Sequence, residues 1–287
     1  MPRIAYVNGR YEPISDAMVN IQDRGYQFAD GIYEVCLVVD GAWWDRDGHI
    51  ARLGRSLDML SIAPPMSDAA LQVVLSKVLR KNALRSALIY IQVTRGVAPR
   101  NHPFPGDLPS ALVITARPYD FAKADKIARS GVAVITQDDI RWSRVDIKSI
   151  SLLPNVLAKQ AAHEQGAAEA MLVRDGLVTE GSSSNMWMID QNGYLITHPA
   201  NQQILGGITR ATTIRCAEKL QLTVQERAFT VEEALAAKEV FLTSATTLVT
   251  PVTKINQKKI ANGEPGGLTK RLRDTYIDLN KREAKVF

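Results

Sequence analysis

Two lysines lie close together in the stretch RVDIKSISLLPNVLAKQAA, and their neighbours differ. Lys148 follows an Asp and an Ile and precedes the apolar run SISLLP, so we expect partly apolar surroundings for its amine. Such surroundings favour the neutral amine, which can form a Schiff base with an aldehyde. Lys159 lies among small and polar residues of an expected helix, where a solvated lysine is the ordinary case. The pattern favours Lys148 but is weak by itself.

A carboxylate at Glu180, in VTEGSSSN, is the second candidate. A strand ending at Thr179 and a polar Gly-Ser-Ser-Ser turn would explain the neighbouring residues without it. A buried carboxylate must be paired or hydrogen-bonded to remain charged. A protonated pyridine nitrogen would be such a partner, and protonation makes that ring a better electron sink.

Three further features are typical of anion binding. In ILGGITRATTIRC two glycines lead into an expected helix, whose first N–H groups attract anions. LTSATT offers hydroxyl groups at an expected strand end, and Arg52 could donate two bonds to a phosphate. In TRGVAPRNHPF, Arg100 and His102 flank Asn101 in a proline-bounded loop. Each feature alone also fits an ordinary turn, helix surface or solvated loop.

The elements that must position these residues are strands with tight turns and amphipathic helices. Four dipeptides predict turns between strands: Asn8-Gly9, Asp40-Gly41, Asp175-Gly176 and Asn192-Gly193. Helical periodicity or caps predict helices over HIARLGRSLDMLSI, DAALQVVLSKVLRKN, LLPNVLAKQAAHEQG, GITRATTIRCAEKLQ and TKRLRDTYIDLNKREAK. Ser67 and Asp68 are candidate caps of the second helix, and Pro154 is expected near the first turn of the third. We expect EVFLTSATTLVTPVTKI to be a strand. The pattern predicts an α+β chain with two domains, residues 1–117 and 124–287, joined by a linker at 118–123.

Composition excludes several other classes. The 287 residues carry a net charge of +5 from 35 basic and 30 acidic residues, and these are scattered, so nucleic-acid binding is not favoured. Two distant cysteines and a start without an apolar core predict a reduced, cytoplasmic protein. No apolar run approaches the roughly 18 residues of a membrane span. The four histidines lack metal-ligand spacing, so no metal is expected.

Seven blocks together resemble the class IV pyridoxal-phosphate aminotransferases, in particular those that act on D-amino acids. In chain order they are DRGYQFADGIYEV, HIARL, IYIQVTRGVAPRNHPFP, DIRWSRVDIKSISLLPNVLAKQAAHE, VTEGSSSN, THPANQQILGGITR and TSATTLVTPV. The resemblance covers essentially the full chain. It implies the two-domain fold type IV architecture, with most of the cofactor site in the C-terminal domain, and a homodimer whose active site is shared across the interface.

The resemblance also implies a role for individual residues. Lys148 matches the lysine that binds pyridoxal 5′-phosphate and moves the substrate proton, and we expect it at a strand end that faces the cofactor. Glu180 matches the carboxylate on the pyridine nitrogen. Tyr33, Arg100 and His102 match groups that bind the substrate α-carboxylate, the latter two from the partner subunit. Ser182 and Ser183 are expected to adjust the surroundings of Glu180. The remaining cofactor-binding positions are Arg52, Ser183, Leu205, Ile208, Thr209, Ser244 and Ala245.

The implied reaction is a ping-pong transamination between D-amino acids and 2-oxo acids, of the D-alanine/2-oxoglutarate type. Alternatives on the same fold are branched-chain or (R)-amine aminotransferase and aminodeoxychorismate lyase, and the RNH sequence of the loop favours the D-amino acid enzyme. A non-catalytic binding protein is a different class, and Lys148 with Glu180 disfavours it. Two departures stand out: Ala245 stands where close relatives often have threonine, and Leu37 stands where similar sequences can have lysine, which is expected to make the pocket edge more apolar.

Overall fold

The computed structural model describes residues 3–286, which form two compact units. The first unit reaches Asp120 and also takes Ile147–Ser151 and the chain from Ala284 onward. The second unit comprises Phe121–Asp146 and Leu152–Glu283. The division falls within the expected linker 118–123, but helix α4 (Phe121–Ser130) already begins there. The segment with Lys148 therefore packs with the first unit, which a division at a single linker does not describe.

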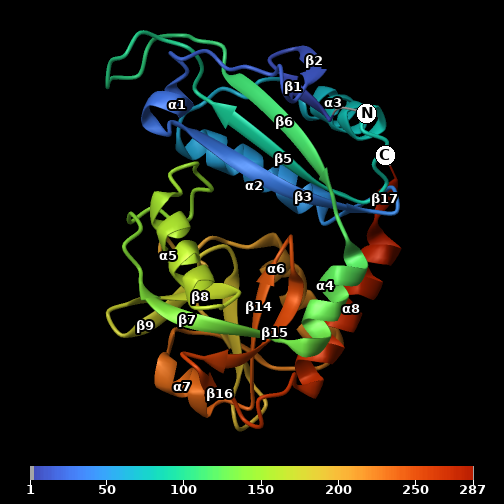
Figure 1. Ribbon diagram of the computed structural model, residues 1–287, viewed down its shortest axis with the longest axis vertical. Helices are drawn as coiled ribbons and strands as arrows, with labels where there is room; N and C mark the ends of the chain where they lie inside the picture. Colours follow the sequence, from blue (N-terminus) through green and yellow to red (C-terminus); the bar gives the residue numbers. More distant parts are fainter. Residues whose placement is uncertain (1–2, 287) are drawn as a thin grey trace. The chain divides into compact units, whose positions relative to one another are not determined.

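The first unit is built on an antiparallel sheet (Figure 1). The turns Asn8-Gly9 and Asp40-Gly41 have positive φ at both residues, 44° and 97° and then 51° and 85°, as the tight hairpin turn requires. Both predicted hairpins are confirmed. The strands, in spatial order, are β17 (Lys285–Val286), β4 (Ala42–Trp44), β3 (Gly31–Val39), β5 (Ala87–Thr94), β6 (Ala111–Pro118), β1 (Ile4–Val7) and β2 (Arg10–Pro13).

Two helices, α2 (Arg46–Met59) and α3 (Asp68–Lys81), cover one face of this sheet. The predicted periodicity holds, because Ile50, Leu53 and Leu57 of α2 are buried in the core with alternate residues of β3, β5 and β6. The predicted cap of α3 is confirmed, since the Ser67 hydroxyl accepts the N–H of Ala70. A five-residue helix, α1 (Arg24–Phe28), precedes β3.

The second unit is built on a ten-stranded mixed sheet. Its neighbouring pairs are antiparallel except β7–β8, β7–β15 and β11–β12. In spatial order the strands are β12 (Val224–Glu226), β11 (Leu195–Thr197), β10 (Asn185–Ile189), β14 (Glu239–Ser244), β15 (Leu248–Ile255), β7 (Val132–Asp138), β8 (Glu169–Arg174), β9 (Leu177–Gly181) and β13 (Phe229–Thr230), with β16 (Lys258–Lys259) paired to β15.

The segment EVFLTSATTLVTPVTKI was expected to be one strand, and this is wrong: it is the hairpin β14–β15. The turn lacks glycine and proline. It is closed instead by the Ser244 hydroxyl, which accepts the N–H of Thr247, and by Leu248 with a φ of 60°. The side chain thus supplies the turn geometry that a glycine would otherwise provide.

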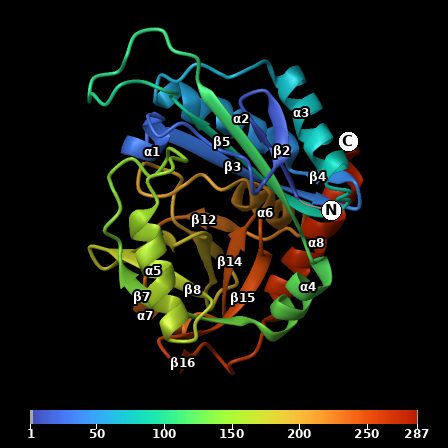
Figure 2. The same cartoon turned by 45° about the horizontal axis from the view of Figure 1, so that its top comes forward.

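Helices surround the second sheet (Figures 1 and 2). Helix α5 (Leu153–Glu164) packs on β8, with Pro154 in its first turn as predicted. Helix α6 (Ile208–Lys219) packs against β14, and α8 (Gly267–Glu283) lies along β15. Helix α7 (Val231–Ala236) is a short helix, and Thr230 and Glu233 form a capping box at its N-terminus. No helix within residues 3–286 is long and apolar enough to cross a membrane.

Candidate active site

Arg52 of α2 is a buried residue, 5% exposed, and not a surface arginine. Its Nε donates to Glu34 Oε1 at 2.6 Å and its Nη2 to Glu34 Oε2 at 2.9 Å, while His49 Nδ1 lies 2.8 Å from Oε2. Burial alone would raise the pKa of Glu34, but the charge and hydrogen bonds of Arg52 bring it well below its ordinary value. Glu34 therefore stays ionised and fixes the guanidinium in one orientation.

Lys148 was expected at a strand end, and the structure corrects this: it lies in an irregular segment docked on β3. Tyr33 N–H donates to the Lys148 carbonyl at 3.0 Å, and the next residue, Ser149, forms a bridge with Ile32. Gly31 of β3 is crowded from two sides, because a Cβ there would lie 2.7 Å from the Val93 carbonyl oxygen of β5 and 3.1 Å from Ile150 Cδ1 of the lysine segment. The lysine is thus positioned by backbone contacts of its segment with Gly31, Ile32 and Tyr33.

The amine of Lys148 faces an aromatic ring. Its Nζ lies 4.1 Å from the ring centroid of Tyr33, which stacks on Tyr90 at 5.6 Å. Within residues 3–286 no carboxylate forms an ion pair with this half-buried amine. A lysine without a bonded carboxylate keeps its amine available as a nucleophile and base. Lys159, in contrast, lies on α5 as predicted, and its half-exposed side chain donates to the Ala168 carbonyl at 2.6 Å.

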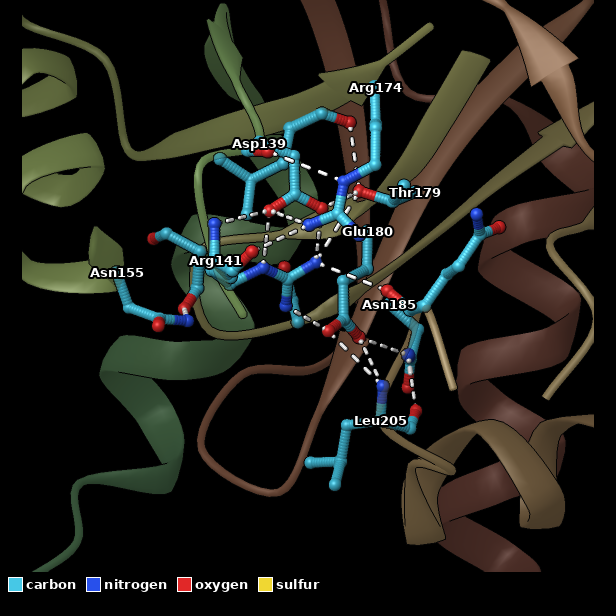
Figure 3. A network of polar contacts seen from close by, with 12 residues as sticks. Asp139, Arg141, Asn155, Arg174, Thr179, Glu180, Asn185 and Leu205 are labelled. Carbon is cyan, nitrogen blue, oxygen red and sulfur yellow. Dashed lines mark hydrogen bonds and ion pairs between the residues drawn. The ribbon is translucent and has the colours of Figure 1, made fainter. Parts of the chain in front are cut away.

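Glu180 lies within β9 rather than after a strand, and its carboxylate is the centre of a polar network (Figure 3). Arg141 Nη1 donates to Glu180 Oε1 and Asn185 Nδ2 donates to Oε2 at 2.8 Å. The backbone N–H of Leu205 lies 3.2 Å from both oxygens. Arg141 is itself held by Asp139, with Nε–Oδ1 and Nη2–Oδ2 distances of 2.8 Å.

The network described here pairs two acidic side chains, Asp139 and Glu180, with two basic ones, Arg141 and Arg174. Burial alone would lower the pKa of Arg141, but the hydrogen bond to Asp139 and the charge of Glu180 raise it above its ordinary value. Burial would likewise raise the pKa of Asp139, and the bonds from Arg141 lower it. Arg174 adds a second cation 3.1 Å from Asp139. Two buried carboxylates, Asp139 and Glu180, thus face two guanidinium groups, and opposite charges at this distance favour the charged form of each group.

The serines after Glu180 contact a different carboxylate from the one expected. The hydroxyls of Ser182, Ser183 and Ser184 all donate to Glu169, at 2.7 Å for Ser183 and 3.1 Å for Ser184. Their direct electrostatic effect is therefore on Glu169, a residue that the sequence patterns did not single out. The serine turn leads into Asn185, through which it can influence Glu180.

The second unit also presents backbone groups for an anion. Helix α6 begins at Ile208 and Thr209 after Gly207, which forms the N-cap without a side chain to bond the first N–H groups. A Cβ on Gly207 would overlap the amide of Asn185, so this position requires glycine. The Ser244 hydroxyl lies 3.0 Å from that of Thr246 and 2.8 Å from that of Thr247, in the β14–β15 turn that contains Ala245. The local geometry fits the expected phosphate contacts.

The loop with Arg100 and His102 is exposed and belongs to the first unit. Both side chains lie against Phe28 of α1: the Arg100 Cζ is 4.6 Å from the ring centroid and the His102 ring is 5.4 Å away. The two predicted substrate-binding groups are therefore brought together. Phe28 was not singled out by the sequence patterns, although it stands in the DRGYQF block.

The residues present fit pyridoxal 5′-phosphate. An aldehyde needs an amine without a bonded carboxylate, as at Lys148, and a pyridine nitrogen needs a carboxylate held in a fixed position, as at Glu180. A phosphate needs N–H donors or a fixed guanidinium, as at Ile208, Thr209 and Arg52. Within residues 3–286 no group of acidic, histidine or cysteine side chains is arranged to hold a metal ion.

Comparisons with known proteins agree with these features. The amino-transferase class IV family matches residues 31–255. A D-alanine aminotransferase of Bacillus licheniformis is 45% identical over 265 residues, covering 92% of this chain and 93% of that protein. A D-alanine aminotransferase of Listeria innocua is 41% identical, covering 95% and 94%.

Solved structures share the fold. A branched-chain aminotransferase from the archaeon Thermoproteus uzoniensis, solved with norvaline, has a TM-score of 0.85 and 24% identity, covering 96% of this chain and 94% of that chain. The branched-chain amino acid aminotransferase from Escherichia coli has a TM-score of 0.87 and 23% identity, covering 98% and 95%. The matched family agrees with the presence on this chain of an amine at Lys148, a buried carboxylate at Glu180 and backbone N–H groups at the start of α6. The protein belongs to the class IV aminotransferases, enzymes that use pyridoxal 5′-phosphate.

Proposed function

We propose that this enzyme transfers the amino group between D-amino acids and 2-oxo acids, with D-alanine and 2-oxoglutarate as representative substrates. The observation that carries the proposal is the Lys148 amine, fixed against Tyr33 without a bonded carboxylate. Relatives with 40–45% identity over more than 90% of the chain are named D-alanine aminotransferases, which supports the D-amino acid specificity.

Lys148 is the proposed catalytic base and acid. When bound, pyridoxal phosphate supplies an electron sink for the charge left at the substrate Cα. Lys148 Nζ takes the proton from Cα and returns it to the C4′ position, and in the second half-reaction it acts in the reverse direction. Glu180 is the second proposed catalytic residue, because its ionised carboxylate keeps the pyridine nitrogen protonated. The Arg141 and Asn185 bonds hold that carboxylate in place.

The other expected residues hold the cofactor and the substrate. Tyr33, Arg100 and His102 are proposed to bind the substrate α-carboxylate, and this fixes which hydrogen of the substrate is presented. Arg100 and His102 supply the cationic and hydrogen-bonding groups that a carboxylate requires. The proposed cofactor contacts are Arg52, Ser183, Leu205, Ile208, Thr209, Ser244 and Ala245.

A homodimer is part of the proposal, because each unit exposes large apolar side chains that a second copy would cover. In the first unit, Met18, Ile21 and Tyr26 are 81%, 79% and 76% exposed. In the second unit, α5 exposes Leu153, Val156 and Leu157, at 69%, 58% and 55%, and Ile140 and Trp142 precede it. Gathered apolar residues of this kind mark interaction surfaces. The buried thiols Cys36 and Cys216, which form no disulfide, support a cytoplasmic location.

Alternatives of the same fold are less well supported. The branched-chain aminotransferases share the fold at 23–25% identity, whereas the D-alanine aminotransferases share 39–45% of residues. The loop with Arg100 and His102 also separates the proposal from an (R)-amine aminotransferase, because it provides two groups for a carboxylate that a simple amine lacks. An aminodeoxychorismate lyase is the remaining alternative on this fold, and the names of the relatives favour the D-amino acid enzyme over it.

The decisive experiment is a half-reaction screen. The purified enzyme is saturated with pyridoxal phosphate, and D-alanine, L-alanine, L-leucine and (R)-1-phenylethylamine are added separately while the cofactor absorption is followed. Rapid loss of the initial band with D-alanine, and slow or no loss with the L-amino acids, supports the proposal. A faster response to L-leucine or to the amine would contradict it. A protein that stays colourless after addition of the cofactor would favour a non-catalytic binding protein.

A further inference from the structure

The loop that carries Arg100 and His102 is held by the buried side chain of Arg24, which is 3% exposed. Arg24 Nη1 donates to the Asn101 carbonyl at 2.6 Å and Nη2 donates to the His102 carbonyl at 3.2 Å. One planar guanidinium thus bonds two successive carbonyl groups of the loop. Because both carbonyls accept hydrogen bonds from Arg24 of α1, the backbone between Arg100 and His102 is held in one conformation.

Asp30 anchors this guanidinium and a second one. Arg24 Nε lies 2.7 Å from Asp30 Oδ2, and Arg95 bonds both oxygens at 2.8 and 3.0 Å. The ring of Phe104, further along the same loop, stacks on Arg95 with its centroid 3.5 Å from Cζ. Burial alone would raise the pKa of Asp30, but the bonds from Arg95 and Arg24 lower it. The ionised Asp30 carboxylate therefore anchors both arginines that contact the loop. Arg24 bonds the Asn101 and His102 carbonyls, and Arg95 packs against Phe104.

Phe28 completes the support. Its ring centroid lies 4.9 Å from the Cζ of Arg24, 4.6 Å from the Cζ of Arg100 and 5.4 Å from the ring of His102. Guanidinium and imidazole groups are attracted to an aromatic face. Arg100 and His102 are exposed, so without the ring the flexible arginine would sample many rotamers. The ring holds both groups side by side before any ligand binds.

We propose that Phe28 is a positioning residue for the substrate carboxylate, and that Arg24 and Asp30 fix the backbone beneath it. This deepens the proposed function and rests on it. Preordering matters because immobilising a flexible side chain on binding reduces affinity. Loss of the ring should therefore weaken substrate binding while the chemistry at Lys148 and the affinity for the cofactor are retained. The contacts of Phe28 with Arg100 and His102 lie within one subunit, so the proposed role is the same whether the loop serves its own active site or that of the partner subunit.

The test compares Phe28→Leu with Phe28→Tyr in the cofactor-saturated enzyme. Phe28→Leu should raise the KM for D-alanine and for 2-oxoglutarate by about three- to ten-fold, the size expected of a lost contact between a cation and a ring. The kcat should stay within about two-fold, since the transition-state groups are untouched. Phe28→Tyr keeps the ring and should restore the wild-type KM. Tyr11→Leu is the matched control, because Lys77 Nζ lies 4.7 Å from that ring on β2, outside α1 and the loop.

Arg24→Lys provides an independent variant, because lysine keeps the charge but cannot bond both carbonyls in one plane. Arg24→Lys should therefore also raise the KM for D-alanine and for 2-oxoglutarate. A wild-type KM in Phe28→Leu and Arg24→Lys would overturn the inference. So would a parallel fall of kcat, cofactor affinity and melting temperature, which would indicate a structural role alone. A wild-type enzyme inactive toward D-alanine would instead contradict the proposed function, and the two failures are thereby distinguished.

Discussion

Glu34 of β3 and Arg52 of α2 form a buried ion pair with two hydrogen bonds, 2.6 and 2.9 Å long. The carboxylate side chain is 1% exposed and that of the arginine 6%. The pair joins the sheet of the first unit to its covering helix and also orients the guanidinium proposed to bind phosphate. Removing one member of such a pair leaves the other as an uncompensated buried charge, which is far more costly than losing a surface ion pair.

The Glu34→Gln variant should be less stable than the wild type, by an amount that depends on pH. At neutral pH the loss in free energy of unfolding is expected to be about 3–5 kcal/mol, as for other broken buried pairs. The pKa of Glu34 is lowered in the folded state from its ordinary value of 4.5, so its contribution is complete above that pH. The contribution is lost as the pH falls through the folded-state pKa.

The measurement is denaturant unfolding of wild type and variant at several pH values. The difference between them should be largest at neutral pH. It should begin to shrink below about pH 4.5, where the carboxylate of the unfolded chain binds a proton, and should disappear only when the pH falls through the lower folded-state pKa. Asp47→Asn offers a control, because that carboxylate is exposed and pairs with Lys285 on the surface. A difference that grows on acidification would refute the role assigned to Glu34.

Lys148→Ala should abolish transamination, and Lys159→Ala should not. The first change removes the amine that lies against Tyr33, and the second removes a half-exposed amine on α5. Loss of the base that moves the proton is expected to reduce the rate by at least about 10²- to 10⁴-fold. The steady-state rate with D-alanine and 2-oxoglutarate measures this. Addition of methylamine should partly restore activity to Lys148→Ala, and near-normal activity without it would disprove the assignment.

Arg141→Met should lower kcat with little effect on the KM for D-alanine. The variant leaves Glu180 without its guanidinium partner, while Asn185 and the Leu205 N–H remain. Without that cation the buried carboxylate more readily takes up a proton, and a protonated Glu180 cannot hold the ring nitrogen in its charged form. We expect a fall in kcat of about ten- to a hundred-fold, with a shift in its acid limb to higher pH. Arg174→Met is the graded control, because Arg174 pairs with Asp139 and donates to the Asp139 and Arg141 carbonyls but has no bond to Glu180 among those described.

Local signals in the sequence predicted the elements well. Asn8-Gly9 and Asp40-Gly41 both favour positive φ, and Ser67 bonds an N–H three residues away, so these features depend only on near neighbours. The β14–β15 turn was missed because its closing group is the Ser244 hydroxyl rather than a glycine. Lys148 was placed at a strand end because the docking of its segment on β3 depends on contacts more than 100 positions apart.

The partners of the candidate site residues were not predictable for the same reason. Glu180 was found from its place beside the serines, but Arg141 meets it from 39 positions away. Glu34 stands in an apolar strand whose alternation would place a hydrophobic residue there, and only the packing of α2 reveals why a charge is tolerated. A sequence pattern proposes candidate groups for a ligand, whereas the partners that orient those groups, such as Arg141 and Glu34, follow from tertiary packing.

Ala245→Thr should tighten cofactor binding. Ala245 lies in the β14–β15 turn, between the hydroxyls of Ser244 and Thr246, and its side chain is partly exposed, so the larger residue can be accommodated. A threonine would add a hydroxyl donor to the proposed phosphate contacts, and one net hydrogen bond contributes about 0.5–1.5 kcal/mol. The dissociation constant of pyridoxal phosphate should therefore fall by about two- to ten-fold, measured by titration of the apoenzyme. Ala245→Val, which has a similar shape without the hydroxyl, is the control and should not tighten binding. An equal gain in both variants would show that packing rather than a phosphate bond is responsible.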